Sequence, residues 1–380
     1  MPRDSKTSKK TVIVILRRTP SRPFSVRELT CLLLSVSQPF MMGFLQNVAI
    51  IGAGGMVGSS ILKALVDTKQ HNITILTRSA TKHRFPPTVA VVEVDYSSFD
   101  SLVLALQGQD VLISALGKFA LVNERLLVDA AFTAKVKRLI PSEFGGNLLN
   151  LKTRVLPNYK HKVDIQERLF ELCQADKESS MTYTLVFNNV LLDWSLSSGL
   201  ILDQGKRVIH KYDDGNTLFS TTRVSTVGLA VAAILQNYDE TANRAVYIQD
   251  IAITQNELIT IIQEEDIKLL FADNQATCRS GKSGESLAER DFPFPFNGGS
   301  SRRLEVTHID TASMEEEAKA DVSNGAAIDT LFYCFAARAA FAREYGGYFE
   351  HNDNNMLGLR GLSREGLRRV VREALLSTTA

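Results

Sequence analysis

The chain has 380 residues, of which 44% are hydrophobic and 22% charged, so it can bury one large core or two modest ones. A formal net charge of +1 implies no general attraction to nucleic acid. The four cysteines form no C-x-x-C pair, and the six histidines show no metal-binding spacing, so no metal site is expected. These features favour a soluble enzyme in a reducing compartment, and we expect a cytoplasmic location.

The first 46 residues form a basic leader. They carry eight Lys or Arg against two acidic residues, which gives +6 here and leaves −5 for the rest of the chain. An apolar run in this leader is interrupted by Ser35 and Pro39 before about 20 apolar residues accumulate, which argues against a membrane span. A mitochondrial presequence fits the Arg and Ser content. Because Met41 and Met42 stand just before the first predicted strand, we favour a disordered extension or an upstream start that the working protein lacks.

A glycine-rich turn follows the leader. Residues 48–51 predict a short buried strand, and apolar residues at helical spacing follow at 57–65. Between them, Gly52 would permit a tight turn, Gly55 a close approach to a ligand, and Gly58 tight packing of the helix on the strand. The free N–H groups at the helix start favour an anion, although an ordinary strand-to-helix turn is the alternative. The cofactor-binding residues predicted here are Gly52, Ala53, Gly54, Gly55, Met56, Val57 and Gly58.

Strand and helix patterns then alternate, which is typical of a parallel sheet covered by helices. Further strands are predicted at 73–76, 89–92, 111–114, 138–141 and 182–187, with helices at 99–106, 122–134 and 162–172. The predicted fold class is therefore α/β, a Rossmann-type doubly wound parallel sheet over residues 47–190. Residues 191–380 are expected to form a smaller C-terminal α/β substrate-binding domain. Ligands of such sheets bind at the carboxyl ends of the strands.

The loop after the second strand discriminates between the nicotinamide cofactors. An Asp or Glu there would hold the ribose hydroxyl of NAD, but no carboxylate occurs between Asn72 and Pro86. Arg78, Lys82 and Arg84 are cationic instead, and such side chains suit the 2′-phosphate of NADP(H). A solvated basic loop is the alternative reading. We predict that Arg78 and Lys82 bind NADP(H).

Four motifs together carry a resemblance to a known family. They are the turn at 52–58, the Arg78 loop, DVLISALG at 110–117 and VKRLIPSEFG at 136–145, of which the last is the most specific. The chain resembles the NmrA-like, atypical short-chain dehydrogenase group that includes isoflavone reductase and phenylcoumaran benzylic ether reductase. Segments at 192–199, 241–247 and 353–359 are similar to fungal members of that group.

The resemblance implies a single catalytic lysine on the helix after PSEFG, which by position is Lys162. A lysine acts as a general base only if burial or neighbouring charge lowers its pKa, and Lys160 and His161 could contribute such charge. Two departures stand out. Gln166 occupies the position where the family often has arginine, and Tyr159 precedes the lysine by three residues, whereas ordinary short-chain dehydrogenases have a spacing of four.

The remaining site predictions concern the ends of two strands. Ser114 and Gly117 are expected to face the nicotinamide. Asn188, Asn189 and Trp194 follow the sixth predicted strand, where a substrate pocket should open, although core packing is the alternative for Trp194.

The C-terminal third is less periodic. A capping box from Thr254 to Glu257 predicts the start of a short helix, and residues 364–376 predict a docked amphipathic helix. Residues 273–303 break the pattern and have no counterpart in the family, so we expect a disordered insert or a retained intron.

These motifs predict an NADP(H)-dependent reductase in secondary metabolism. The resemblance implies a small aromatic or polyketide-like natural product as substrate, with Lys162 as a general acid/base. The main alternative is an NmrA-type regulator that senses the dinucleotide without catalysis, and a scaffold with a vestigial nucleotide site is a third. No nucleic-acid or membrane partner is expected, and the motifs leave the oligomeric state open.

Overall fold

The computed structural model describes residues 45–80, 83–117, 123–175, 181–280 and 303–377, and at 175, 272–280 and 329 it describes the backbone alone. The predicted leader up to residue 44, Lys82 and most of the predicted insert therefore lie outside the described residues.

A parallel sheet forms the centre of the described chain, with strand order β11-β6-β5-β4-β1-β2-β3. From β1 the chain continues to β2 and β3 on one side, and the later strands β4, β5, β6 and β11 follow on the other side. The strand order therefore reverses beside β1, and folds of this kind bind ligands at such a switch point. The predicted fold class is confirmed. The strands are β1 (Asn47–Ile51), β2 (Asn72–Thr77), β3 (Ala90–Glu93), β4 (Val111–Ser114), β5 (Arg138–Ile140), β6 (Thr182–Phe187) and β11 (Arg244–Tyr247).

Helices cover both faces of this sheet because successive side chains of a strand point to opposite faces. Val48 and Ile50 of β1 pack into a core with α2 (Met56–Thr68) and α8 (Val224–Gln236). Ala49 and Ile51 belong to the core beneath three other helices. Those helices are α3 (Phe99–Leu106), α4 (Glu124–Thr133) and α6 (Lys160–Ala175). The central strands β1, β4 and β5 are therefore buried on both sides, whereas all four residues of the edge strand β3 are exposed.

The last strand of the sheet comes from beyond residue 190, where the sequence predicted the nucleotide-binding part to end. β11 pairs in parallel with β6, with Arg244 opposite Thr184. Residues 45–380 cluster as one compact unit, so the predicted boundary at residue 190 falls inside that unit.

Two smaller sheets build the C-terminal part, with strand orders β12-β10-β7 and β13-β9-β8. Their core contains Phe219, Tyr212 and Phe341, whose rings stack or meet edge to face at about 5 Å. The strands are β7 (Val190–Leu191), β8 (Leu202–Asp203), β9 (Val208–Tyr212), β10 (Leu218–Thr222), β12 (Ile251–Thr254) and β13 (Glu305–Ile309). The remaining helical elements are α5 (Leu151–Arg154), η2 (Pro157–Tyr159), α7 (Leu192–Ser195), α9 (Gln255–Ser280), α10 (Thr311–Ser323), η3 (Ile328–Leu331), α11 (Phe332–Phe341) and α12 (Arg364–Leu376).

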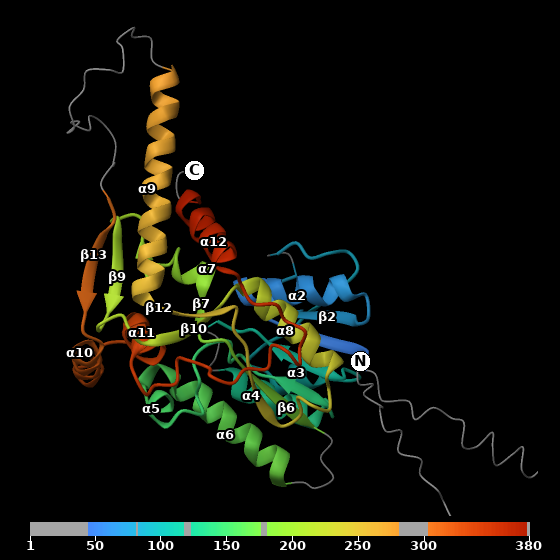
Figure 1. Cartoon of the computed structure of the whole chain (residues 1–380). Coiled ribbons are helices and arrows are strands. Elements are labelled where there is room, and N and C mark those ends of the chain that lie inside the picture. Colours follow the sequence, from blue (N-terminus) through green and yellow to red (C-terminus); the bar gives the residue numbers. More distant parts are fainter. Residues whose placement is uncertain (1–44, 81–82, 118–122, 176–180, 281–302, 378–380) are drawn as a thin grey trace, which may run out of the picture. The chain divides into compact units, whose positions relative to one another are not determined.

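The capping box at the start of α9 is confirmed. The Glu257 amide donates to the Thr254 hydroxyl at 3.2 Å, and the Thr254 amide donates to the Glu257 carboxylate at 3.1 Å. The expectation of a short helix is wrong, because α9 runs for 26 residues and extends into the segment that was expected to break the pattern. The buried carboxylate of Glu265 binds Arg368 and Arg372 of α12, which therefore lies beside α9 (Figure 1). The predicted amphipathic helix at 364–376 is confirmed as α12.

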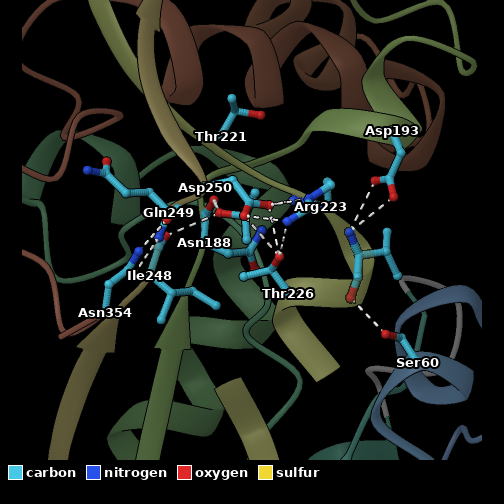
Figure 2. A network of polar contacts seen from close by, with 12 residues as sticks. Ser60, Asn188, Asp193, Thr221, Arg223, Thr226, Ile248, Gln249, Asp250 and Asn354 are labelled. Carbon is cyan, nitrogen blue, oxygen red and sulfur yellow. Dashed lines mark hydrogen bonds and ion pairs between the residues drawn. The ribbon is translucent and has the colours of Figure 1, made fainter. Parts of the chain in front are cut away.

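A polar network joins the C-terminal part to the nucleotide-binding sheet (Figure 2). The guanidinium of Arg223 binds both carboxylate oxygens of the buried Asp250 at 3.0 Å. At the start of α8, the Val224 amide donates to Asp193 of α7, and the Val224 carbonyl accepts from the Ser60 hydroxyl of α2 at 2.8 Å. These contacts fix α8, and with it α2, against the smaller sheets. Among the described helices, none is long and apolar enough to cross a membrane.

Candidate functional site

The glycine turn between β1 and α2 needs its glycines for steric reasons. Gly52 has a φ of +82°, in the left-handed region that favours glycine, and a Cβ there would lie 2.4 Å from the carbonyl oxygen of Ala115. A Cβ on Gly58 would lie 2.1 Å from the carbonyl oxygen of Gly52. The structure thus assigns the roles that were predicted for both residues: Gly52 makes the tight turn, and Gly58 lets the helix approach it.

The amino-terminal end of α2 is open to an anion. Gly55 is the N-cap and supplies no side-chain hydrogen bond, and the first turn of the helix contains no acidic residue. The first N–H groups of a helix have no internal partner, and the helix dipole favours negative charge there. This end therefore fits the pyrophosphate of a dinucleotide. Of the other predicted residues, Met56 is exposed and Val57 packs partly into the core.

A cleft of about 520 Å³ opens beside this turn at the carboxyl edge of the sheet. Its walls come from the glycine turn, the end of β2 and the end of β4. Sequence reasoning did not predict the three ring-bearing residues of the cleft, although Tyr96 follows directly on the third strand, where ligand contacts are expected. The lining residues are Gly52, Ala53, Gly54, Gly55, Ile75, Leu76, Thr77, Arg78, Ser79, His83, Phe85, Tyr96, Ala115, Leu116 and Gly117.

Arg78 presents a cation in this cleft. Its side chain is exposed, its guanidinium carbon lies 5.6 Å from the centre of the Tyr96 ring, and it forms no ion pair with another described residue. A second cleft of about 560 Å³ shares Arg78 and Tyr96. The carboxylates beside it are engaged elsewhere, since Glu93 accepts from the Ala80 amide and Asp95 from Ser97. The guanidinium is therefore available for a phosphate group.

Lys162 lies in the first turn of α6, which begins at Lys160, two residues before the predicted helix start. Its side chain is half-buried and reaches the turn after β5, where Nζ donates to the carbonyl oxygen of Glu143 at 2.5 Å. Burial lowers the pKa of Lys162 below its usual range, while the negative charges of Glu143 and Glu124 oppose this shift. The direction of this shift is the one that a proton-transferring lysine needs, and its cause is burial.

The two cationic neighbours expected to assist Lys162 do not act on it. Lys160 forms an exposed ion pair with Asp164 at 3.1 Å, and His161 is exposed. The charges that influence Lys162 come instead from Glu143, which follows β5, and from Glu124, the first residue of α4. Sequence reasoning did not single out either glutamate, although Glu143 lies within the PSEFG motif itself.

Gln166, the position where the sequence departs from the family pattern, contacts one of these glutamates. It is fully buried, and its Nε2 donates to Oε1 of Glu143 at 2.9 Å. Burial raises the pKa of Glu143 to about 7, although Lys162 and Gln166 both lower it. Burial also raises the pKa of Glu124, whose Oε1 accepts from the Ser142 amide at 2.8 Å.

A hydrogen bond connects the cleft to the turn that Lys162 contacts. The Ser142 hydroxyl donates to the carbonyl oxygen of Leu116 at 2.7 Å, which ties the turn before Glu143 to a residue that lines the cleft. The two loops follow β4 and β5, which are neighbours in the sheet. Of the predicted residues at the end of β4, Gly117 lines the cleft and Ser114 is buried beside Glu124.

The three predicted substrate-binding residues lie elsewhere. Asn188 and Asn189 are buried, and Asn189 has a φ of +49° and donates to the carbonyl oxygens of Ser220 and Gly347. Trp194 of α7 stacks on Tyr333 with ring centres 5.8 Å apart. None of the three lines the clefts described above. Their contacts are with the protein itself, and their role toward a substrate stays a prediction.

The glycine turn, the cleft and PSEFG all lie in the part of the chain that a family model covers. The model of the NmrA-like family matches residues 45–274, which is more than half of the chain. The chain belongs to the NmrA-like family. This confirms the resemblance seen in the sequence motifs. Among the described residues of this NmrA-like protein, no three His, Cys, Asp or Glu side chains gather as a metal site requires.

Named relatives and solved structures are similar to this NmrA-like chain. The oxidoreductase aprR of Aspergillus flavus is 32% identical over 57% of this chain and 73% of its own length. The leucoanthocyanidin reductase of Vitis vinifera in a ternary complex has a TM-score of 0.61 and 16% identity, over 87% of this chain and 99% of that one. AtPrR2 with NADP⁺ and (+)-pinoresinol has a TM-score of 0.62 and 17% identity, over 88% and 100%. At such identities the two structures show a shared fold.

Proposed function

We propose that this chain is an NADPH-dependent reductase of a small aromatic or polyketide-like natural product, with Lys162 as the proton carrier. One observation carries the proposal. The open amino-terminal end of α2 and the guanidinium of Arg78, which has no ion-pair partner among the described residues, meet in one cleft. Lys162, whose pKa is lowered by burial, contacts the turn after β5. Perturbed lysines in such positions are typical of catalytic sites.

The residues present fit NADPH. The start of α2 would hold the pyrophosphate, Arg78 the 2′-phosphate, and the loop after β4 would face the nicotinamide. NADPH would supply a hydride to the substrate. The ammonium group of Lys162 would give a proton to the substrate atom that gains negative charge, and burial of the lysine favours that release.

The substrate class is supported by relatives and neighbours. One curated relative is named an oxidoreductase, and one solved neighbour holds NADP⁺ together with pinoresinol, an aromatic compound. Another neighbour is a leucoanthocyanidin reductase. The resemblance to fungal family members supports a polyketide-like product as the other member of the proposed class, and secondary metabolism as the setting.

The test is to incubate the purified chain with NADPH and extracts of its own metabolites, and to follow cofactor oxidation and new products. Lys162→Met keeps the stem and removes the amine, so turnover should fall by roughly 10² to 10⁴, the usual contribution of general acid–base catalysis. NADPH affinity, measured by calorimetry, should change little. Lys160→Met is the matched control, because Lys160 lies on the same helix turn but is exposed and paired with Asp164.

Each outcome separates two roles of the site. Near-normal turnover in Lys162→Met would reject the proton-carrying role, and loss of NADPH binding would make Lys162 mainly a cofactor ligand. If the wild type binds NADPH but turns over no tested metabolite, the result favours the dinucleotide-sensing regulator, and a pull-down for a protein partner is the next measurement.

A further inference from the structure

Glu143 contacts α6 through both its backbone and its side chain. Its carbonyl oxygen accepts from Lys162 Nζ at 2.5 Å, and its Oε1 accepts from Gln166 Nε2 at 2.9 Å. Lys162 and Gln166 are four residues apart and so share one face of the helix. Glu143 is only 2% exposed, and its Oε2 is buried without a hydrogen-bond partner among the described residues. One carboxyl oxygen is therefore free to carry a proton.

A second buried carboxyl group faces the same space. Glu124 is 1% exposed, and while its Oε1 accepts from the Ser142 amide, its Oε2 makes no hydrogen bond of normal geometry with a described residue. The side chain of Ser114 at the end of β4 lies near it. The negative charges of Glu124 and Glu143 both favour the protonated form of Lys162, and they disfavour each other.

Among the described residues, Tyr159 of η2 is the other titratable group beside this cluster. It lies close enough to Glu143 to be influenced by that charge, and burial raises the pKa of Tyr159 to about 12. The phenol is therefore neutral near pH 7. The groups whose charge can change in this cluster are Glu124 of α4, Glu143 after β5 and Lys162 of α6.

The charges of these three groups do not balance if all are ionised. Two carboxylates and one ammonium leave one unpaired negative charge in a buried site, which is costly. Burial and mutual repulsion therefore favour a state in which the two carboxyl groups share a proton. Since burial raises the pKa of Glu143 to about 7, Glu143 loses this proton as the pH rises past neutrality.

We propose that Glu143 is a positioning residue. Its backbone carbonyl holds the Lys162 ammonium in place, and its carboxyl group, together with that of Glu124, sets how readily the ammonium releases its proton. This inference rests on the proton-carrying role proposed for Lys162. While Glu143 is ionised, its charge stabilises the ammonium form of the lysine. When Glu143 is protonated, that stabilisation is lost and the lysine releases its proton more easily. The two titrations are coupled.

The test measures the protonation of Lys162 directly. Competitive labelling with acetic anhydride across a pH series, read by mass spectrometry of the Lys162 peptide, gives the midpoint at which the amine becomes reactive. Glu143→Gln removes the charge and should move this midpoint down by about one pH unit or more, because a nearby opposite charge shifts a pKa by about 1 to 3. Glu167→Gln is the matched control, since Glu167 is on the same helix with its side chain 58% exposed. In this variant the Lys162 midpoint should equal that of the wild type.

An unchanged midpoint in folded Glu143→Gln overturns the inference. If that variant does not fold, Glu124→Gln decides, since the same charge argument requires its midpoint to fall, and an unchanged midpoint there also overturns it. The labelling needs no substrate, so its result stands even if the proposed reductase activity fails. Where turnover is found, the pH profile of kcat should lose an ionisation near pH 7 in Glu143→Gln, whereas a merely structural role would leave the profile of the remaining activity unchanged.

Discussion

Replacing Arg78 with alanine should reduce the preference for NADPH over NADH. The guanidinium is exposed in the cleft and has no ion-pair partner among the described residues, so a 2′-phosphate would not have to displace one. Hydrogen bonds to charged groups contribute about 1.5 to 3 kcal/mol, and exposure reduces this, so we expect about 1 to 3 kcal/mol. This corresponds to roughly 5- to 150-fold in the ratio of the two dissociation constants. The contact of Arg78 with Tyr96 is lost with either cofactor and so cancels from the ratio.

Calorimetric titration of the wild type and the variant with both cofactors measures this ratio. Arg84→Ala is the matched control, because Arg84 is an exposed cation of the same loop that does not line either cleft. Equal affinities of the wild type for NADPH and NADH would refute the reasoning. So would a ratio that survives Arg78→Ala, or one that falls as far in Arg84→Ala.

Two further predictions concern stability. Gly58→Ala places a Cβ 2.1 Å from the Gly52 carbonyl oxygen, so chemical denaturation should show a loss of about 1 to 3 kcal/mol, whereas Gly117→Ala, with open space around its Cβ, should change little. Comparable losses in the two would contradict the steric account. Ion pairs and hydrogen bonds lower the pKa of the buried Glu265 from 4.5 to about 2 despite its burial, so Glu265→Gln should cost about 3 kcal/mol at neutral pH. Because the folded pKa of Glu265 is lower than the unfolded one, this stabilisation is present above about pH 4.5 and disappears as the pH falls toward 2. The exposed control Glu264→Gln should cost less than about 1 kcal/mol. Equal costs in Glu264→Gln and Glu265→Gln would refute the argument.

Some features of this protein were predictable from the sequence because their causes are local. The alternation of apolar strands and amphipathic helices predicted β1, β4, β6, α3 and α12 within a residue of their observed bounds. The glycine spacing predicted the turn at Gly52 and Gly58, since backbone conformation and the missing Cβ are properties of those residues themselves. The cationic side chain of Arg78 could be predicted for the same reason. Its place at the end of β2, beside β1 in the sheet, then puts it in the cleft.

Other features were decided only by tertiary structure. β11 is a four-residue strand with little periodicity, and its place depends on pairing with β6, about 60 residues earlier. The docking of α9 on α12 depends on Glu265, which binds Arg368 and Arg372 of a helix about 100 residues away. The apolar pattern of one segment does not predict which distant segment it pairs with.

The electrostatics of the candidate site belong to this second class. The motif and the helix predicted where Lys162 lies, but not what surrounds it. Its lowered pKa results from burial, opposed by Glu143 from the turn after β5 and Glu124 from α4. The pKa of Glu143 depends in turn on Lys162 and on Gln166. The sequence determines which groups can titrate, whereas a pKa shift measures the loss of water and the approach of other charges, which arise only when separate elements of the chain pack together.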